Sequence, residues 1–205
     1  MDSIVCPNHE DCALKSDEDL VALVLRNKQC YVCLMRRYEN KISRYVMRIS
    51  GASQETVEDI VQNVFLKAFI NLNEFDSSLK FSSWLYRIAH NETINDWRRN
   101  KKSKANKISW DENEALKNVI KDTLDVEDDV YQRLINKELL EVINSLDEKY
   151  KNVIVLNYLE GKSYQEIADI LKKPIGTIGT LISRAKKTLA KKLEERGILA
   201  DAAVR

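Results

Sequence analysis

Glycine, proline and long apolar runs are all scarce in this sequence of 205 residues. Five glycines and two prolines leave few places for tight turns, so the composition favours long helices with short connections. No apolar run approaches the roughly 20 residues of a membrane-spanning helix. The stretch Met1–Cys6 lacks the basic end and the apolar core of a signal peptide. These absences predict a cytoplasmic protein without a membrane segment, whose four cysteines are reduced thiols or metal ligands.

Motifs of the common enzyme classes are also missing. The chain has no glycine-rich loop that would cradle a phosphate and no metallohydrolase motif. Its two histidines, His9 and His90, lie near no obvious nucleophile. The sequence therefore predicts a protein that is not an enzyme and has no catalytic residues.

Charge is unevenly distributed, although the net charge is only +1. Residues 98–107 carry six cationic side chains and no acid, whereas residues 111–129 carry eight acids against two lysines. A cationic block beside an anionic block suggests two partners or two parts of one partner. Taken alone, each block is more typical of a solvated surface, so its position in the chain has to decide between the two interpretations.

Helical periodicity divides the chain into two structured parts. The apolar positions of residues 57–72 follow i, i+3, i+4, i+7 and predict one buried stripe, and a second helix is expected from Ser82 or Ser83 to Trp97. The acidic stretch lacks this period and is typical of a tether. The predicted fold class is all-α, with two small helical domains joined by an acidic flexible linker. The expected segments are a leader at 1–16, a domain at 17–107, the linker at 108–130, a second domain at 131–196 and a tail at 197–205.

The second domain carries the sharpest pattern. Ser163 and Glu166 predict a capping box at a helix start, Pro174 and Gly176 interrupt that helix, and a cationic helix follows with Thr177 as its expected cap. Helix, short turn and cationic helix are typical of a helix-turn-helix, whose second helix enters the major groove of DNA. An ordinary helical hairpin with a solvated basic face is the alternative. Hydroxyls and cations suited to phosphates and base edges lie on the outer face of the second helix: Thr177, Thr180, Ser183, Arg184 and Lys187.

Three stretches, in this order, resemble the extracytoplasmic-function, or group IV, sigma factors of the bacterial sigma-70 family. They are Val57-Glu-Asp-Ile-Val-Gln-Asn-Val-Phe-Leu-Lys-Ala-Phe, then Phe81-Ser-Ser-Trp-Leu-Tyr-Arg-Ile-Ala-His-Asn, and then Leu146-Asp-Glu-Lys-Tyr-Lys-Asn-Val-Ile-Val-Leu with Glu160-Gly-Lys-Ser-Tyr-Gln-Glu-Ile-Ala and Ile175-Gly-Thr-Ile. The likeness spans roughly residues 17–193. It implies a protein that binds core RNA polymerase and directs promoter recognition, DNA melting and transcription initiation. It also implies that residues 17–107 are sigma region 2 and residues 131–196 are sigma region 4.

The resemblance implies roles for residues of the first domain. The Val57 stretch is similar to the helix that contacts the clamp helices of the polymerase β′ subunit, through Asp59, Gln62 and Asn63 with Leu66 as an apolar neighbour. The Phe81 stretch is similar to the part that melts and reads the −10 element, where bases stack on aromatic rings and phosphates pair with cations. Trp84 is expected in the core, and for Phe81 a core position and base stacking are equally compatible. The expected DNA contacts are Lys80, Phe81, Ser82, Ser83, Arg87 and Asn91, with Arg98, Arg99, Lys101 and Lys102 on the duplex backbone upstream.

The second domain is similar to the one that reads the −35 element, but it departs from the family pattern. Gly179 and Leu181 stand where the family has a cationic residue and an arginine, and Gly179 also lowers helix stability by up to about 1 kcal/mol relative to alanine. We expect a weak or altered −35 preference and dependence on another DNA-locating factor.

The resemblance also names the partners. They are core RNA polymerase, through its β′ clamp helices and its β subunit, and promoter DNA in double- and single-stranded form, with an anti-sigma factor as a further candidate. In this family the connection between the domains threads the channel through which RNA leaves the polymerase. Eight carboxylates there mimic a phosphate chain, although a solubilising tether is the alternative.

The amino terminus has no counterpart in the family pattern. Cys30 and Cys33 are spaced i, i+3, and together with Cys6, Cys12 or His9 they can complete a tetrahedral zinc set that fixes the leader to the first helix and responds to redox state. The spacing matches no zinc signature closely, and small buried cysteines are the alternative. No cofactor is therefore predicted, with a structural zinc ion as the alternative.

A stand-alone transcriptional regulator with a helix-turn-helix is the competing interpretation. Such a protein would need neither the polar face of residues 58–67 nor the polar and aromatic residues of 81–91.

Overall fold

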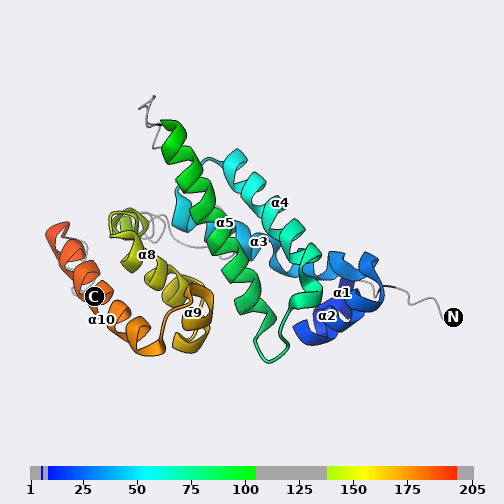
Figure 1. Ribbon diagram of the computed structural model, residues 1–205. Coiled ribbons are helices and arrows are strands. Elements are labelled where there is room, and N and C mark those ends of the chain that lie inside the picture. The colour runs from blue at the N-terminus through cyan, green and yellow to red at the C-terminus, as the bar shows by residue number, and fades with distance from the viewer. Residues whose placement is uncertain (1–5, 7–8, 105–137, 198–205) are drawn as a thin grey trace.

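The computed structural model describes Cys6, residues 9–104 and residues 138–197 of the chain (Figure 1). These residues form helices and contain no strand, which confirms the predicted all-α fold. No helix within these ranges is both long enough and apolar enough to cross a membrane. The predicted linker and the last residues of the tail lie outside the described residues, as do 1–5 and 7–8 of the leader. The helices are α1 (His9–Leu14), α2 (Asp17–Arg26), η1 (Lys28–Cys30), α3 (Tyr31–Ser50), α4 (Gln54–Ile70), η2 (Leu72–Glu74), α5 (Phe81–Lys104), residues 138–144, α8 (Glu148–Ile154), η3 (Val155–Leu159), α9 (Tyr164–Leu171) and α10 (Ile175–Glu195).

Helices α3, α4 and α5 pack together to build the amino-terminal part. Helix α3 ends at Gly51, whose left-handed backbone (φ 62°) suits a residue without a Cβ atom. Helix α4 begins after Ser53, whose side chain accepts a hydrogen bond from the backbone N–H of Thr56, as the sequence predicts for this start. The predicted apolar stripe of α4 is buried at Val57, Ile60, Val61, Val64, Phe65 and Ala68.

Helix α5 is longer than the sequence predicts. It begins at Phe81 and continues past Trp97 to Lys104, so the start of the basic run is helical. Arginine and lysine are good helix formers, and neither glycine nor proline occurs within these residues, so nothing stops the helix where its apolar stripe ends.

The carboxy-terminal part consists of residues 138–144, α8, η3, α9 and α10, where η3 is a π-helical turn that continues α8. The predicted capping box of Ser163 and Glu166 is present at the start of α9. The predicted start of the last helix is wrong, because α10 begins at Ile175 with Pro174 as its N-cap, so Gly176 and Thr177 lie inside its first turn. Proline suits this position because the first turn of a helix does not use its missing N–H.

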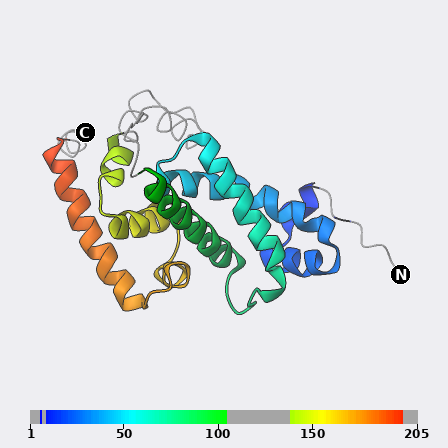
Figure 2. The ribbon, with the colours of Figure 1, turned by 45° about the horizontal axis from the view of Figure 1, so that its top comes forward.

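The two parts are in direct contact. Helix α9 packs on α5, and η3 packs on α3. In both ribbon views α4 lies on one side of α5 while α8 and α9 lie on the other, and α10 forms the outer edge of the carboxy-terminal part (Figures 1 and 2). One continuous cluster of buried apolar residues runs through both parts.

Candidate nucleic-acid interface

The outer face of α4 is polar with an apolar end. Asp59, Gln62 and Asn63 are exposed on the side opposite the buried stripe, and the Asn63 side chain donates a hydrogen bond to the Asp59 carbonyl at 2.9 Å. Leu66 is 56% exposed and Ile70 is 63% exposed, although both are large and apolar. The sequence analysis missed Ile70, which its spacing of i+4 from Leu66 would have indicated. The four predicted polymerase contacts thus share one open face.

An aromatic cluster closes the core where α5 begins. The Phe81 ring is 1% exposed and lies 5.6 Å from the Tyr38 ring and 5.7 Å from the rings of Phe75 and Trp84, measured between centroids. Of the two alternatives for Phe81, the structure therefore has the core position. Trp84 is also buried, as expected.

The loop before α5 is held by its own polar contacts. The carboxylate of Asp76 accepts a hydrogen bond from the Ser78 N–H at 2.9 Å, and this bond lowers the pKa of that carboxyl below its usual range. The Leu79 N–H donates to the Asp76 carbonyl at 3.0 Å. Lys80 follows directly, with its side chain largely exposed at the end of the turn.

The predicted DNA contacts on α5 differ in exposure. Asn91, Arg98 and Arg99 are exposed, Ser82 and Arg87 are half-buried, and Ser83 is buried. The Ser83 hydroxyl has no hydrogen-bond partner among the residues that the structure describes. The side chains of Lys101 and Lys102 lie outside the described part.

Residues of the carboxy-terminal part occupy the beginning of α5. Lys80 pairs with Glu166 at 3.2 Å, and the Lys162 ammonium donates to the Ser82 hydroxyl at 3.3 Å. Lys162 also lies 4.3 Å from the centre of the Tyr86 ring. Two of the predicted DNA contacts are therefore already engaged within the chain.

Glu160 lies at the centre of this contact. One carboxylate oxygen binds the Arg48 guanidinium at 2.6 Å, and the other accepts from the Tyr86 hydroxyl at 2.7 Å. The Arg48 and Glu160 side chains are each only 5% exposed. Burial, together with the charge of Glu160, raises the pKa of Tyr86, so its hydroxyl remains a donor. A buried pair of this kind is sensitive to the loss of either partner, because the other charge is then left without compensation.

His90 lies at the edge of the same contact. Its Nδ1 atom is 3.1 Å from the Tyr45 hydroxyl, which gives this histidine the partner that the sequence did not reveal. Burial, with the nearby charge of Lys173, lowers the pKa of His90 to about 4. The ring lines a cavity of about 540 Å³ together with Lys173 and Leu181 from the carboxy-terminal part.

Helix α10 presents the second candidate surface. All five predicted contacts on it are exposed: Thr177, Thr180, Ser183, Arg184 and Lys187. The Thr180 hydroxyl donates to the Gly176 carbonyl at 2.9 Å. A Cβ atom on Gly179 would meet the Tyr164 ring at 3.9 Å, an ordinary contact, so a side chain fits there. Leu181 is half-buried and faces the cavity at His90 rather than the outer surface.

Comparisons with known proteins assign this architecture to a family. The family models described as sigma-70 region 2 and sigma-70 region 4 match residues 34–103 and 136–189. SigW, an ECF RNA polymerase sigma factor of Bacillus subtilis, is 36% identical over 77% of this chain and 86% of its own length. The chain belongs to the extracytoplasmic-function (ECF) sigma factors.

Other relatives of this sigma factor agree. The ECF sigma-E factor of Haemophilus influenzae is 30% identical over 87% of this chain and 96% of its own length. The structure of CnrH in complex with the cytosolic domain of CnrY matches with a TM-score of 0.65 at 23% identity, covering 88% of this chain and 99% of CnrH. The sigma factor RpoE of Bartonella quintana, solved with the anti-sigma factor NepR, matches with a TM-score of 0.61 at 22% identity, over 78% and 94% of the two chains. These two structures show the shared fold.

Family membership establishes the function in outline. The sigma factor binds core RNA polymerase and promoter DNA and directs promoter recognition and transcription initiation. Sigma factors are initiation factors that need no cofactor, and their family is not one of enzymes. The competing interpretation as a stand-alone regulator is thereby replaced.

The cysteines of this sigma factor differ from the expectation of reduced thiols or zinc ligands. The structure joins Cys6 to Cys30 and Cys12 to Cys33 as disulfides. Cys30 and Cys33 lie on consecutive turns, so each meets a different cysteine of the amino-terminal segment. Within the described part, no group of three or more histidine, cysteine, aspartate or glutamate residues is placed to hold a metal ion, and the side chain of His9 lies outside that part.

Proposed function

We propose that the outer face of α4 is the surface by which this sigma factor binds the β′ clamp helices. The observation that carries this proposal is the exposure of Leu66 and Ile70 beside Asp59, Gln62 and Asn63, on a helix whose opposite face is entirely core. Exposed apolar side chains rimmed by polar groups are typical of a protein-binding surface.

Co-purification with core polymerase tests this proposal. The double variant Asp59→Lys/Gln62→Ala is expected to reduce retention of core polymerase by tenfold or more, on the order of 1.4 kcal/mol. Its matched control is Glu39→Lys, which reverses an exposed carboxylate on α3. If both variants and the unaltered chain retain core polymerase equally, the outer face of α4 is not the polymerase-binding surface.

The −10 element is proposed to bind at the beginning of α5 and along its exposed side. Exposure supports Lys80, Asn91, Arg98 and Arg99 as contacts, and partial exposure supports Ser82 and Arg87. The burial of Phe81 and Ser83 favours a role in positioning the loop over direct contact with the bases. Lys101 and Lys102 keep their proposed backbone contacts on sequence grounds alone.

Access to the −10 surface is proposed to require separation of the two parts. Lys80 and Ser82 are held by Glu166 and Lys162, and both contacts depend on the position of α9. Promoter DNA competes with these intramolecular contacts for the same side chains. We infer that polymerase binding favours the separated arrangement.

The −35 element is proposed to bind the exposed face of α10, with a weak or altered preference. The backbone bond made by the Thr180 hydroxyl supports a reduced set of reading contacts, because it ties up a proton that a phosphate or base would otherwise accept. Leu181 turns away from this face, so arginine at this position would have to reorient in order to contact DNA.

The remaining proposals concern partners and place of action. An acidic linker at 108–130 is proposed to follow the RNA exit channel, on the strength of its composition alone. An anti-sigma factor or a DNA-locating factor is proposed as a regulatory partner, since the two fold relatives were solved with a second protein, named as an anti-sigma factor in the case of NepR. The sigma factor is proposed to act in the cytoplasm and to need no metal ion.

A further inference from the structure

The four cysteines connect the amino-terminal segment to the start of α3. Cys30 ends η1 and Cys33 lies in the first turn of α3, while Cys6 and Cys12 belong to the segment that precedes α2. The Cα–Cα distances of the two pairs are 5.1 and 5.7 Å. Cys12, Cys30 and Cys33 are buried, and Cys6 is only partly buried. Two crosslinks therefore fix one short segment to one helix.

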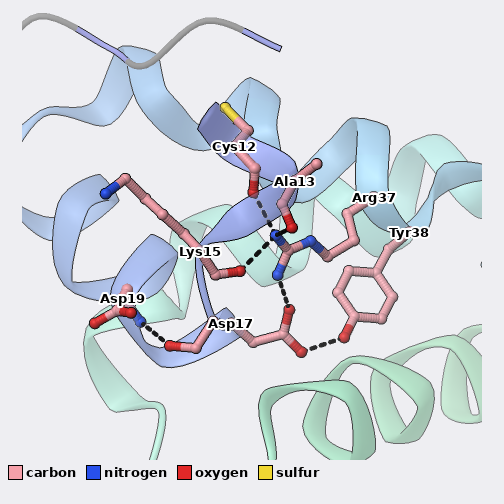
Figure 3. A network of polar contacts seen from close by, with 8 residues as sticks. Cys12, Ala13, Lys15, Asp17, Asp19, Arg37 and Tyr38 are labelled. Carbon is pink, nitrogen blue, oxygen red and sulfur yellow. Dashed lines mark hydrogen bonds and ion pairs between the residues drawn. The ribbon is translucent and has the colours of Figure 1, made fainter. Parts of the chain in front are cut away.

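A polar network ties the same segment to α3 one turn further on (Figure 3). The Arg37 guanidinium donates to the backbone carbonyls of Cys12 and Lys15, the latter at 2.7 Å, and pairs with Asp17 at 2.7 Å. The Tyr38 hydroxyl donates to the other oxygen of Asp17. Because Cys12 supplies both a disulfide sulfur and a carbonyl to this network, its crosslink and the Asp17 contacts depend on each other.

The network continues to the proposed −10 surface. The Tyr38 ring packs edge-on against Phe81 at 5.6 Å, and Phe81 is the first residue of α5. Phe81 also packs on Phe75, which precedes the loop ending at Lys80. A short chain of contacts thus leads from Cys12 through Arg37, Asp17 and Tyr38 to Phe81.

We propose that the four cysteines are a reversible redox site whose oxidation state changes the affinity of this sigma factor for −10 DNA. The inference rests on the proposed DNA-binding role of the beginning of α5. In the oxidised state both disulfides hold the segment on α3 and fix Asp17 against Tyr38. In the reduced state the segment is held only by these polar contacts and by its packing on α3, and the position of Tyr38 against Phe81 is less restricted.

The reaction is thiol–disulfide exchange. For oxidation, a cysteine thiolate attacks one sulfur of a low-molecular-weight disulfide and expels one thiol. The partner cysteine then attacks the mixed disulfide, forms the protein disulfide and expels the second thiol, so each protein disulfide formed consumes one small disulfide and yields two small thiols. A dithiol reductant reverses the sequence. Cys6 is the most accessible of the four, so the Cys6–Cys30 disulfide is expected to be reduced before Cys12–Cys33.

Thiol alkylation and metal analysis of the full chain test the site itself. Protein treated with oxidised glutathione is expected to have no alkylatable thiol under denaturing conditions, and protein treated with dithiothreitol is expected to have all four. Protease cleavage before residue 17 is expected to be slower in the oxidised protein. Zinc at about one ion per chain, with thiols that oxidise only after chelation, would overturn the proposal in favour of a zinc site.

Promoter binding tests the functional consequence. Holoenzyme made from oxidised and reduced sigma factor is expected to differ in affinity for a −10 promoter fragment on the order of 5-fold or more. The variant Cys6→Ser/Cys12→Ser should show one redox-independent affinity. Tyr38→Phe should still form both disulfides but lose most of the redox effect, because only the bond to Asp17 is removed.

The outcomes separate the two proposals. Complete thiol oxidation with identical DNA affinity in both states would overturn the coupling. Failure of holoenzyme to bind the fragment in either state, with Lys80→Ala behaving like the unaltered chain, would instead refute the proposed −10 surface. The alkylation result would still decide the redox site.

Discussion

The two surfaces proposed to bind DNA differ in whether their side chains are engaged by another part of the chain. On α10 the five predicted contacts are exposed, and the hydroxyl of Thr180 bonds only within its own helix. On α5 the first predicted contacts are engaged by the carboxy-terminal part, through Glu166 on Lys80 and Lys162 on Ser82. Duplex DNA can therefore approach α10 without rearrangement, whereas Lys80 and Ser82 become free for DNA only when their contacts with Glu166 and Lys162 break. This difference is what we expect if α10 binds intact duplex and the beginning of α5 binds DNA only after polymerase has joined.

The largest effect on the contact between the two parts is expected at Glu160. Glu160→Ala leaves the Arg48 guanidinium buried without its carboxylate and removes the acceptor of Tyr86, so the contact between the two parts is expected to weaken by about 3–5 kcal/mol. Small-angle X-ray scattering should show a larger radius of gyration for the variant. Glu195→Ala, which breaks a mostly exposed pair with Lys191, is the matched control and should leave the radius unchanged. An unchanged radius in both variants would mean that Glu160 does not hold the parts together.

Acidification is expected to have a smaller effect through His90. Its pKa is lowered to about 4 in the closed arrangement, and an exposed imidazole titrates near 6.5, so the open arrangement binds the proton more tightly. Closure is fully favoured above pH 6.5 and loses up to about 2 kcal/mol by pH 5, the largest loss corresponding to complete exposure of the ring on opening. Tyr45 bonds to His90 and stays neutral because burial raises its pKa, and the charge of Lys173 opposes that of a protonated ring. Asp147, Glu148 and Lys149 line the same cavity, and the two carboxylates among them would favour a protonated ring.

Scattering at a series of pH values checks this expectation. The unaltered chain should expand between neutral pH and pH 5. His90→Gln should remove most of that dependence, because glutamine stays neutral over this range. If the variant expands at the same pH as the unaltered chain, titratable groups other than His90 cause the expansion.

The smallest effect is expected from a substitution at Gly179 in α10, which tests how this helix binds duplex DNA. Gly179→Lys is expected to stabilise α10 by up to about 1 kcal/mol and to add one phosphate contact. A plot of log K for duplex binding against log salt concentration should then have a slope that is steeper by about one. Gly179→Ala is the matched control, because it supplies the helix stability without the charge. Fluorescence anisotropy with −35 duplexes at several salt concentrations distinguishes them. Identical salt dependence of the two variants would mean that residue 179 does not face the DNA.

Local patterns were enough to predict the parts of the fold that depend on nearby residues. The buried stripe of α4, the Ser53 cap and the capping box of Ser163 with Glu166 each arise from side chains within a few positions of one another. The start of α10 was predicted too late, because Pro174 was taken as an interruption when it is the N-cap. All five contacts predicted on α10 are exposed, as their helical spacing indicated.

Contacts between distant residues could not be predicted in this way. Arg48 and Glu160 are separated by more than a hundred positions, and nothing in either local sequence indicates that they pair. The burial of Ser83 and Phe81 likewise depends on how the helices pack around them. The cysteine pairs were not predicted either, since reduced thiols or zinc ligands were expected, and which cysteine meets which depends on how the segment before α2 packs on α3.

A change in the distance between α5 and α10 is the most direct sign that the two parts separate. Fluorescent labels placed at Asn95 and Lys191, both exposed in the structure, would report this distance by energy transfer in the free sigma factor and after addition of core polymerase. The predicted result is high transfer in the free chain and low transfer in a holoenzyme that opens a promoter. High transfer that persists in a promoter-opening holoenzyme would contradict the claim that Lys80 and Ser82 stay engaged by the carboxy-terminal part until polymerase binds.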